Sequence, residues 1–196
     1  MPNTSKATGI SPKVPSPIGA SPPPAAAGKV PGYLVAQMLG GLVGGALVFL
    51  FYREHFRVSE DADGKLACFC TAPNLRQLPQ AFFCETLGTF LLILPIFLMT
   101  DPVVKLPAGE GSAEVPVGLG TLGLLPVGLL VFGIGLSLGG TTGYAINPAR
   151  DLGPRLAHAL LPVPGKRDND WGYAWVPVAG PLTGALLAAG VNALLR

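Results

Sequence analysis

The sequence predicts an all-α membrane protein with four transmembrane helices and one re-entrant half-helix. Three observations support this prediction. Only 12% of the 196 residues are charged, about half the share of a soluble domain. Four segments are long and apolar enough to cross the hydrocarbon core of a bilayer, which takes about 20 residues as a helix. A fifth segment carries strong helix-start signals but is too short to cross.

Composition excludes several classes of protein. The net charge of +2 is spread without clusters, so no basic stripe could follow phosphates and we expect no nucleic-acid partner. The sequence shows no nucleophile–base pair, phosphate-binding loop or metal-ligand spacing. We therefore expect no enzyme activity, no catalytic residue, no metal and no cofactor. Cys68, Cys70 and Cys84 are odd in number and lack nearby histidines, which favours free thiols over disulfides or a zinc site.

Composition also divides the chain into two parts. Residues 2–28 hold seven Pro and four Ser and no apolar segment, a composition that cannot bury a core. Residues 1–28 are therefore predicted to form a disordered Pro/Ser-rich tail. Residues 29–196 are predicted to form one membrane domain.

The predicted membrane spans lie at about 30–52, 80–100, 117–138 and 173–195. Glu85 is the one charged residue within them. Trp171, Tyr173 and Trp175 stand at the start of the last span, where interfacial aromatic side chains are common. We expect an integral protein of the cell membrane, with the lipid bilayer as its surroundings.

Glycines recur at a spacing of four residues within two of these spans. Such pairs let helix backbones approach closely inside lipid, or they leave room for a permeating solute. The pairs are Gly40 with Gly44, Gly41 with Gly45, and Gly180 with Gly184.

The segment between the third and fourth spans is the most informative. Five of the six residues from Gly139 to Tyr144 are Gly or Thr, which favours extended or turning backbone. Asn147 is a good N-cap, Pro148 suits the first helical position, and Asp151 suits the first turn. Two prolines end the helix, so a half-helix is predicted at about 147–161. It would be roughly 20 Å long, too short for a hydrocarbon core of about 30 Å.

A re-entrant half-helix has functional consequences. Non-helical backbone at membrane depth persists only where it is buried or lines a water-filled cavity. The carbonyls of 139–146 would then line a pore, and the positive end of the half-helix would repel cations while Asn147 offers its amide. Arg150 in the first turn would add a full charge, which is costly at that depth unless it lines such a cavity.

The run from Gly143 to Asp151 reads Gly-Tyr-Ala-Ile-Asn-Pro-Ala-Arg-Asp. It resembles the second Asn-Pro-Ala signature of the aquaporins, the major intrinsic proteins. More narrowly, it is similar to the glycerol facilitators, or aquaglyceroporins. The resemblance runs from about Lys29 to Arg196 and implies the third through sixth membrane helices of that fold.

The resemblance implies roles for the signature residues. Asn147, followed by Pro148 and Ala149, would orient the solute at the centre of the pore. Arg150 would be the arginine of the narrow selectivity region.

The resemblance also implies a constriction of the glycerol-facilitator kind. Tyr144 matches an aromatic constriction position, Gly135 matches a position that is His in water-specific channels, and Asp151 is the usual glycerol-facilitator residue after the arginine. Glu85 would accept hydrogen bonds from the backbone of the re-entrant loop. By themselves, the residue types leave simple packing open for Tyr144 and a proton site open for Glu85.

The chain departs from the family pattern in one respect. The family builds its pore from two inverted repeats with an Asn-Pro-Ala motif in each, and this sequence holds one Asn-Pro pair. The two spans and half-helix of the first repeat are absent, so we expect a truncated chain carrying the later part of the pore.

The expected function is passive facilitated diffusion of glycerol and other small uncharged solutes, plus water, with ions and protons excluded. The resemblance implies a homotetramer. Two alternatives stay open: a truncated, non-conducting membrane fragment or interaction subunit of such a channel, and a channel for anions drawn to Arg150.

Overall fold

The structure, a computed structural model, describes residues 28–100, 102–108 and 111–196. The predicted tail therefore lies outside the described residues, apart from its last residue. Within the described part, four long helical segments are apolar enough to span a membrane, which confirms the predicted all-α membrane fold. They are α2 (Val30–Phe51), α5 (Leu78–Leu98), η1 (Gly120–Leu124) continued by α6 (Leu125–Thr142), and α8 (Val176–Leu194).

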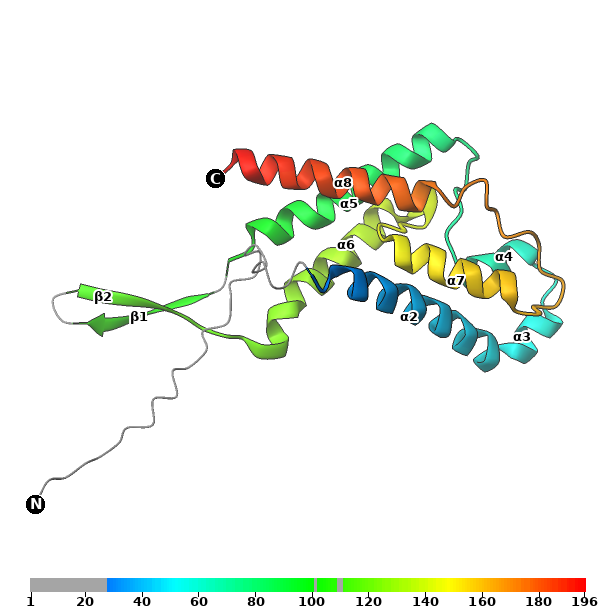
Figure 1. Ribbon diagram of the computed structural model, residues 1–196, viewed down its shortest axis with the longest axis horizontal. Coiled ribbons are helices and arrows are strands. Elements are labelled where there is room, and N and C mark those ends of the chain that lie inside the picture. Colours follow the sequence, from blue (N-terminus) through cyan, green and yellow to red (C-terminus); the bar gives the residue numbers. More distant parts are fainter. Residues whose placement is uncertain (1–27, 101, 109–110) are drawn as a thin grey trace, which may run out of the picture.

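The shorter elements connect these spans (Figure 1). They are α3 (Arg53–Val58), α4 (Ala62–Ala67), the antiparallel strands β1 (Val103–Ala108) and β2 (Gly111–Pro116), and the half-helix α7 (Pro148–Leu160). The sequence did not predict the hairpin, which projects from one end of the molecule (Figure 1). The half-helix starts in the middle of the helical body and ends near α3 and α4 (Figure 1), which confirms a re-entrant segment.

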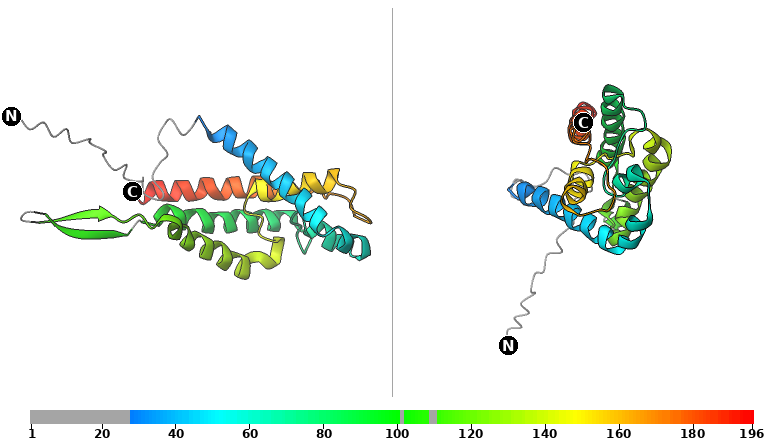
Figure 2. Two further views of the ribbon diagram at one scale, coloured as in Figure 1. Left: turned by 90° about the horizontal axis from the view of Figure 1, so that it is seen from below. Right: turned by 90° about the vertical axis from the view of Figure 1, so that its right-hand side faces the viewer.

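Two helix pairs form the framework. α5 lies along α8, α2 lies along α7, and α6 packs against α5 (Figure 2). At the α3 end, an apolar cluster of buried side chains joins α2, α3 and α7 to the loops beside them. Its members are Phe49, Phe56, Phe69, Ala157 and Val163.

Glycine allows both helix pairs to pack closely. A Cβ atom on Gly45 would come within 2.8 Å of Ala157 Cβ on α7, and one on Gly180 within 2.7 Å of Glu85 Cβ on α5. Gly40 and Gly44, in contrast, have no neighbouring atom within 4 Å of such a position. Close helix packing therefore explains one glycine face of α2, while the other face is open.

Several element boundaries differ from the prediction. α5 begins and ends two residues earlier than expected, and the third span begins at Gly120. α8 begins at Val176, because Tyr173 belongs to the turn before it and is fully buried. Tyr173 is therefore a core residue and not an interfacial one, whereas Trp171 and Trp175 are each 48% exposed.

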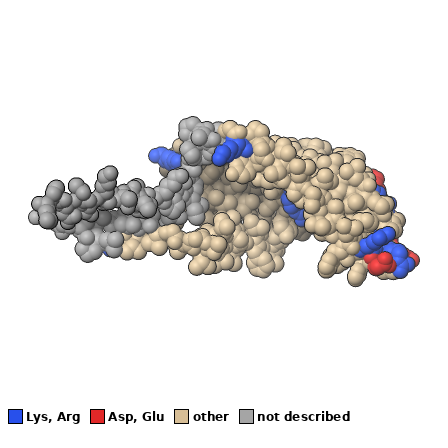
Figure 3. All heavy atoms as spheres, turned by 60° about the horizontal axis from the view of Figure 1, so that its bottom comes forward, with Lys and Arg blue, Asp and Glu red and all other residues tan. Residues whose placement is uncertain are grey.

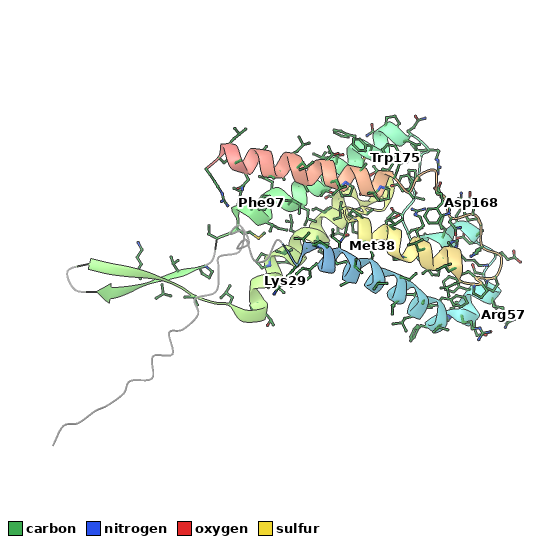
Figure 4. The ribbon with its side chains drawn as sticks, in the orientation of Figure 1. Lys29, Met38, Arg57, Phe97, Asp168 and Trp175 are labelled. Carbon is green, nitrogen blue, oxygen red and sulfur yellow. The ribbon has the colours of Figure 1, made fainter. Side chains whose placement is uncertain are left out.

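Large apolar side chains cover the outside of the four spans. Examples are Leu47, Phe132 and Leu186, each at least 60% exposed, as expected for surfaces that face lipid tails. Charged side chains gather at one end of the molecule, where Figure 4 places Arg57 and Asp168 (Figures 3 and 4). The apolar middle of the molecule is thus suited to the membrane interior, and its charged end is suited to the membrane surface.

Candidate functional site

The re-entrant turn between α6 and α7 has unusual backbone geometry. α6 ends at Thr142, with Gly143 in the left-handed conformation at φ 79°. Tyr144 and Ile146 also have positive φ, 40° each. Non-glycine residues rarely adopt this conformation, and clusters of it concentrate at functional sites.

The non-helical stretch is shorter than the sequence predicts. The expectation of extended backbone from Gly139 onward is wrong, because residues 139–142 continue α6. Their helical hydrogen bonds outweigh the poor helix propensity of Gly and Thr, a common override by tertiary context. The non-helical backbone between the two helices is therefore limited to residues 143–147.

The Glu85 carboxylate holds this turn in place. Glu85 is 1% exposed. It accepts hydrogen bonds from Thr142 Oγ1 (2.7 Å), from the backbone N–H of Ala145 (3.0 Å) and from that of Ile146 (2.7 Å). Charge-assisted bonds of this kind are about twice as strong as neutral ones. They stabilise a turn that two residues with positive φ would otherwise strain.

Asn147 begins the half-helix as the sequence predicts. Its side-chain oxygen accepts hydrogen bonds from the backbone N–H groups of Ala149 (2.9 Å) and Arg150 (3.4 Å). Pro148 takes the first helical position. The positive end of the α7 dipole therefore lies in the middle of the helical body. Ala149 lies against α2, since a Cβ on Gly41 would come within 2.8 Å of its carbonyl oxygen.

The Arg150 guanidinium lies over the Tyr144 ring. The Arg150 guanidinium carbon is 5.9 Å from the centre of the Tyr144 ring, within cation–π range. The ring also covers α6, because a Cβ on Gly135 would approach Tyr144 Cζ to 3.0 Å and one on Gly139 would approach Cδ1 to 2.9 Å. Gly135 therefore does not leave an open gap: the Tyr144 ring fills the space that its missing side chain creates.

Two cavities have Arg150 in their lining. The first, of about 630 Å³, lies toward α4, and its lining includes Thr71, Asn74, Gly139, Gly143 and Arg150. The second, of about 440 Å³, lies toward the middle of the spans, and its lining includes Leu92, Tyr144, Ile146, Asn147, Pro148 and Arg150. Arg150 therefore borders both a cavity near the charged end and a cavity within the spans, and Tyr144 borders the second of them.

Asp151 occupies a different place from the other predicted site residues. It is fully buried and lines neither cavity. Its Oδ2 accepts hydrogen bonds from Thr71 N (2.7 Å) and Thr71 Oγ1 (2.6 Å), and its Oδ1 accepts one from Arg155 Nε (2.9 Å). The carboxylate is turned away from the path because these buried donors compensate its charge.

Arg155 belongs to this network, although its sequence position predicted no role for it. The side chain is fully buried and stacks over the Tyr173 ring at 5.8 Å. Its guanidinium donates to the backbone oxygens of Asn169 and Thr71, each at 2.7 Å. The spacing of four residues from Asp151 on one helix was the available signal, since such pairs face each other.

The loops at the charged end are tied down by two further cations. Arg76 donates to Asp170 Oδ2 at 2.5 Å. Burial would raise the pKa of Asp170, but the hydrogen bond and charge of Arg76 outweigh it and lower that pKa. Lys166 donates to the carbonyls of His158, Ala159 and Leu161 at the end of α7, where cations are favourable.

The described residues hold three free thiols: Cys68 is exposed, Cys84 is half-buried and Cys70 is buried at the edge of the first cavity. Within the described ranges, no group of three His, Cys, Asp or Glu residues is placed to hold a metal ion.

Comparison with known proteins agrees with this geometry. Residues 25–192 match the family described as Major intrinsic protein. The chain is 49% identical over 163 residues to a probable glycerol uptake facilitator protein of Thermotoga maritima, covering 83% of this chain and 64% of that protein. It is 44% identical over 161 residues to a D/L-lactic acid transporter of Lactiplantibacillus plantarum, covering 80% of this chain and 61% of that protein.

A similar structure has also been solved. The X-ray structure of the aquaglyceroporin from Plasmodium falciparum superposes with a TM-score of 0.61 at 28% identity, covering 84% of this chain and 64% of that one. The chain thus spans somewhat less than two thirds of the length of these matched proteins.

Proposed function

Because the chain belongs to the major intrinsic protein family, we propose that it conducts glycerol and other small uncharged solutes, with water, by passive diffusion. The observation that carries the proposal is the Tyr144–Arg150 pair, in which Arg150 lines both cavities and Tyr144 lines the second. The relative from Thermotoga maritima, named a probable glycerol uptake facilitator, supports the same solute class.

The pair suits a polyol chemically. The Tyr144 ring presents an apolar face to the carbon chain, while the Arg150 guanidinium presents several N–H donors to the hydroxyls. Asn147 adds a side-chain amide at the start of α7. A solute that sheds its water here regains hydrogen bonds only on the side of these polar groups. This favours a molecule with one apolar and one hydroxylated face.

Exclusion of ions follows from the same elements. The Arg150 charge and the positive end of α7 both raise the free energy of a cation or proton beside Arg150. An anion would be attracted there but would have to shed its water beside the apolar lining of the second cavity. We therefore propose that charged solutes do not pass.

Liposomes that contain only the purified chain test the proposal. Stopped-flow light scattering should show glycerol entry well above that of empty liposomes, and ion flux at the background level. Glycerol entry at the background rate would contradict the proposal and favour the alternative, a non-conducting fragment or interaction subunit.

A second solute class has support from one relative. The relative from Lactiplantibacillus plantarum, named a D/L-lactic acid transporter, suggests small hydroxy acids in their uncharged form. Liposomes with the chain should then take up lactic acid faster than empty ones, with a larger difference at pH 4 than at pH 7, because the protonated fraction is larger there.

We also propose that four copies associate, as the family resemblance implies. The exposed apolar side chains of the spans are available for such contacts. Sedimentation in detergent should give the mass of a tetramer, and a monomer mass would contradict this proposal.

A further inference from the structure

Thr71 is held from three sides by two charged residues of the half-helix. Asp151 Oδ2 accepts hydrogen bonds from the backbone N–H and the hydroxyl of Thr71, at 2.7 and 2.6 Å. Arg155 donates to the Thr71 carbonyl at 2.7 Å. Each polar group of Thr71 is thus bonded to the Asp151–Arg155 pair.

The same loop is held a second time three residues later. The backbone N–H of Asn74 donates to Thr141 O (3.1 Å), and the Asn74 side-chain amide donates to Gly140 O (2.5 Å). Both acceptors belong to the last turn of α6. Residues 71–74, which we call the wall segment, are therefore suspended between α7 and the end of α6.

The wall segment borders the path beside the constriction. All four of its residues line the first cavity together with Arg150. Thr71 also touches the re-entrant turn, because a Cβ on Gly143 would lie 3.2 Å from Thr71 Cγ2. A displacement of the wall segment would therefore change the width of the path on the side where Arg150 lies.

We propose that the Asp151–Arg155 pair positions the wall segment and so limits the size of the solutes that reach the Tyr144–Arg150 constriction. Both members are positioning residues, since neither lines the second cavity and both act through Thr71. The limit on solute size rests on the proposed channel function, whereas the positioning itself does not.

The cost of burying two charges favours a positioning role for the Asp151–Arg155 pair over a purely stabilising one. Asp151 and Arg155 are each fully buried, and a buried ion pair often contributes little net stability compared with apolar side chains of similar volume. The pair does, however, fix geometry, because Arg155 also donates to the carbonyls of Asn169 and Asp170. One guanidinium thus ties three separate parts of the chain together.

Permeation of polyols of increasing length tests the size limit. We would reconstitute the full chain and its variants Arg155→Lys and Thr71→Val, and measure entry of three-, four- and five-carbon polyols relative to water. Arg155→Lys removes the forked bonds but keeps the charge, and Thr71→Val removes one hydroxyl donor with little change in shape. The ratio of four-carbon to three-carbon entry should rise roughly threefold, since one carbon of steric fit changes selectivity by at least that much.

Lys166→Gln is the matched control. Lys166 ties down the opposite end of α7 through three carbonyls and does not contact the wall segment. A general loosening of α7 would alter the solute ratios in this variant as well. The proposal requires them to change in Arg155→Lys and Thr71→Val and to remain at the parental value in Lys166→Gln. Equal ratios in all the proteins would overturn the size limit.

Cys70 provides a readout that needs no transport. It precedes the wall segment, is 1% exposed, and burial raises the pKa of its thiol to about 12, so reaction with a maleimide should be slow. In a Cys68→Ser, Cys84→Ser background, alkylation should become at least roughly fivefold faster in Arg155→Lys and Thr71→Val. It should not change in Lys166→Gln.

The two measurements distinguish a failure of the proposed channel function from a failure of the proposed positioning role. If the parent passes no polyol, the proposed channel function fails, and the Cys70 rates still decide the positioning. Alkylation of Cys70 at the parental rate in both Arg155→Lys and Thr71→Val would overturn the positioning role by itself.

Discussion

The guanidinium carbon of Arg150 lies 5.9 Å from the centre of the Tyr144 ring, and atoms of the same ring lie close to Gly135 and Gly139 of α6. One aromatic ring is thus in contact both with two glycine positions of α6 and with a cation. Because the ring already occupies the space beside Gly135 and Gly139, we expect the distance between Tyr144 and Arg150 to depend on how α7 is placed.

Replacing Tyr144 and Gly135 together should shift the preference from glycerol to water. A histidine at 135 alone would collide with the ring, since even a Cβ there lies 3.0 Å from Tyr144 Cζ. The double variant Tyr144→Thr, Gly135→His removes the Tyr144 ring and fills the vacated space with a polar side chain. The ratio of glycerol to water permeability in liposomes should fall about tenfold or more.

Tyr33→Thr controls for the loss of an aromatic residue. Tyr33 lies on α2, is 63% exposed and lines neither cavity. Its variant should keep the parental permeability ratio. A double variant with that same ratio would contradict the constriction assigned to Tyr144 and Arg150.

Glu85→Gln should destabilise the re-entrant turn. The substitution replaces an acceptor-only carboxylate by an amide whose NH₂ faces backbone donors, so Ala145 N or Ile146 N loses its partner. An orphaned buried donor costs about 1–3 kcal/mol. Thermal unfolding in detergent, followed by circular dichroism, should show a lower midpoint. The exposed Glu60, changed in the same way, should leave the midpoint where it is.

The two glycine faces of α2 should respond differently to alanine. Gly41→Ala and Gly45→Ala place a methyl group 2.8 Å from Ala149 O and Ala157 Cβ respectively, and overpacking of this kind costs about 1–3 kcal/mol. Both variants should unfold at lower temperature.

Gly40→Ala and Gly44→Ala serve as controls on the same helix, since no atom lies within 4 Å of either new methyl group. Their helix propensity improves, so their unfolding midpoints should not fall. Equal destabilisation on the two faces would argue against the observed packing of α2 on α7.

Acid should weaken the loop before α8 through Asp170. Arg76 lowers the pKa of Asp170 against the opposing effect of burial. Because the folded-state pKa lies below the unfolded value of about 3.9, the stabilisation is complete above about pH 4. It is lost as the pH falls through the folded-state pKa.

Asp170→Asn should therefore be less stable than the parent near pH 6, and the difference should shrink toward pH 3. Asparagine also tolerates the φ of 48° at this position. Unfolding midpoints measured across this pH range test the expectation. Asp168→Asn is the control, since Asp168 is exposed and pairs with Arg167. A constant difference between Asp170→Asn and the parent would contradict it.

Local sequence signals predicted much of the framework. Four apolar runs gave four spans, since apolar length is a property of each segment by itself. The start of the half-helix was also readable, because Asn147 caps it with its own side chain and Pro148 follows directly. The hairpin at 103–116 lacked such signals, and the helical state of 139–142 contradicted the local propensity.

The roles of the buried polar residues depended on contacts that no local pattern contains. Asp151 bonds to Thr71, which is 80 residues away along the chain, and Arg155 reaches the same residue from one turn further along α7. From the sequence, Asp151 was expected beside the pore, and Arg155 had no expected role. A carboxylate points to the side where donors compensate its charge, and that side is known only when the chain has folded.

The sequence by itself therefore determined the membrane class, the spans and the start of the half-helix, because hydropathy and helix capping act over neighbouring residues. Only the tertiary structure decided that the Tyr144 ring fills the space above Gly135 and that Asp151 turns inward to Thr71. Both outcomes depend on which segments come within a few ångströms of one another. In this chain, glycines and buried charged residues with three or more hydrogen-bond partners determine which segments lie that close together.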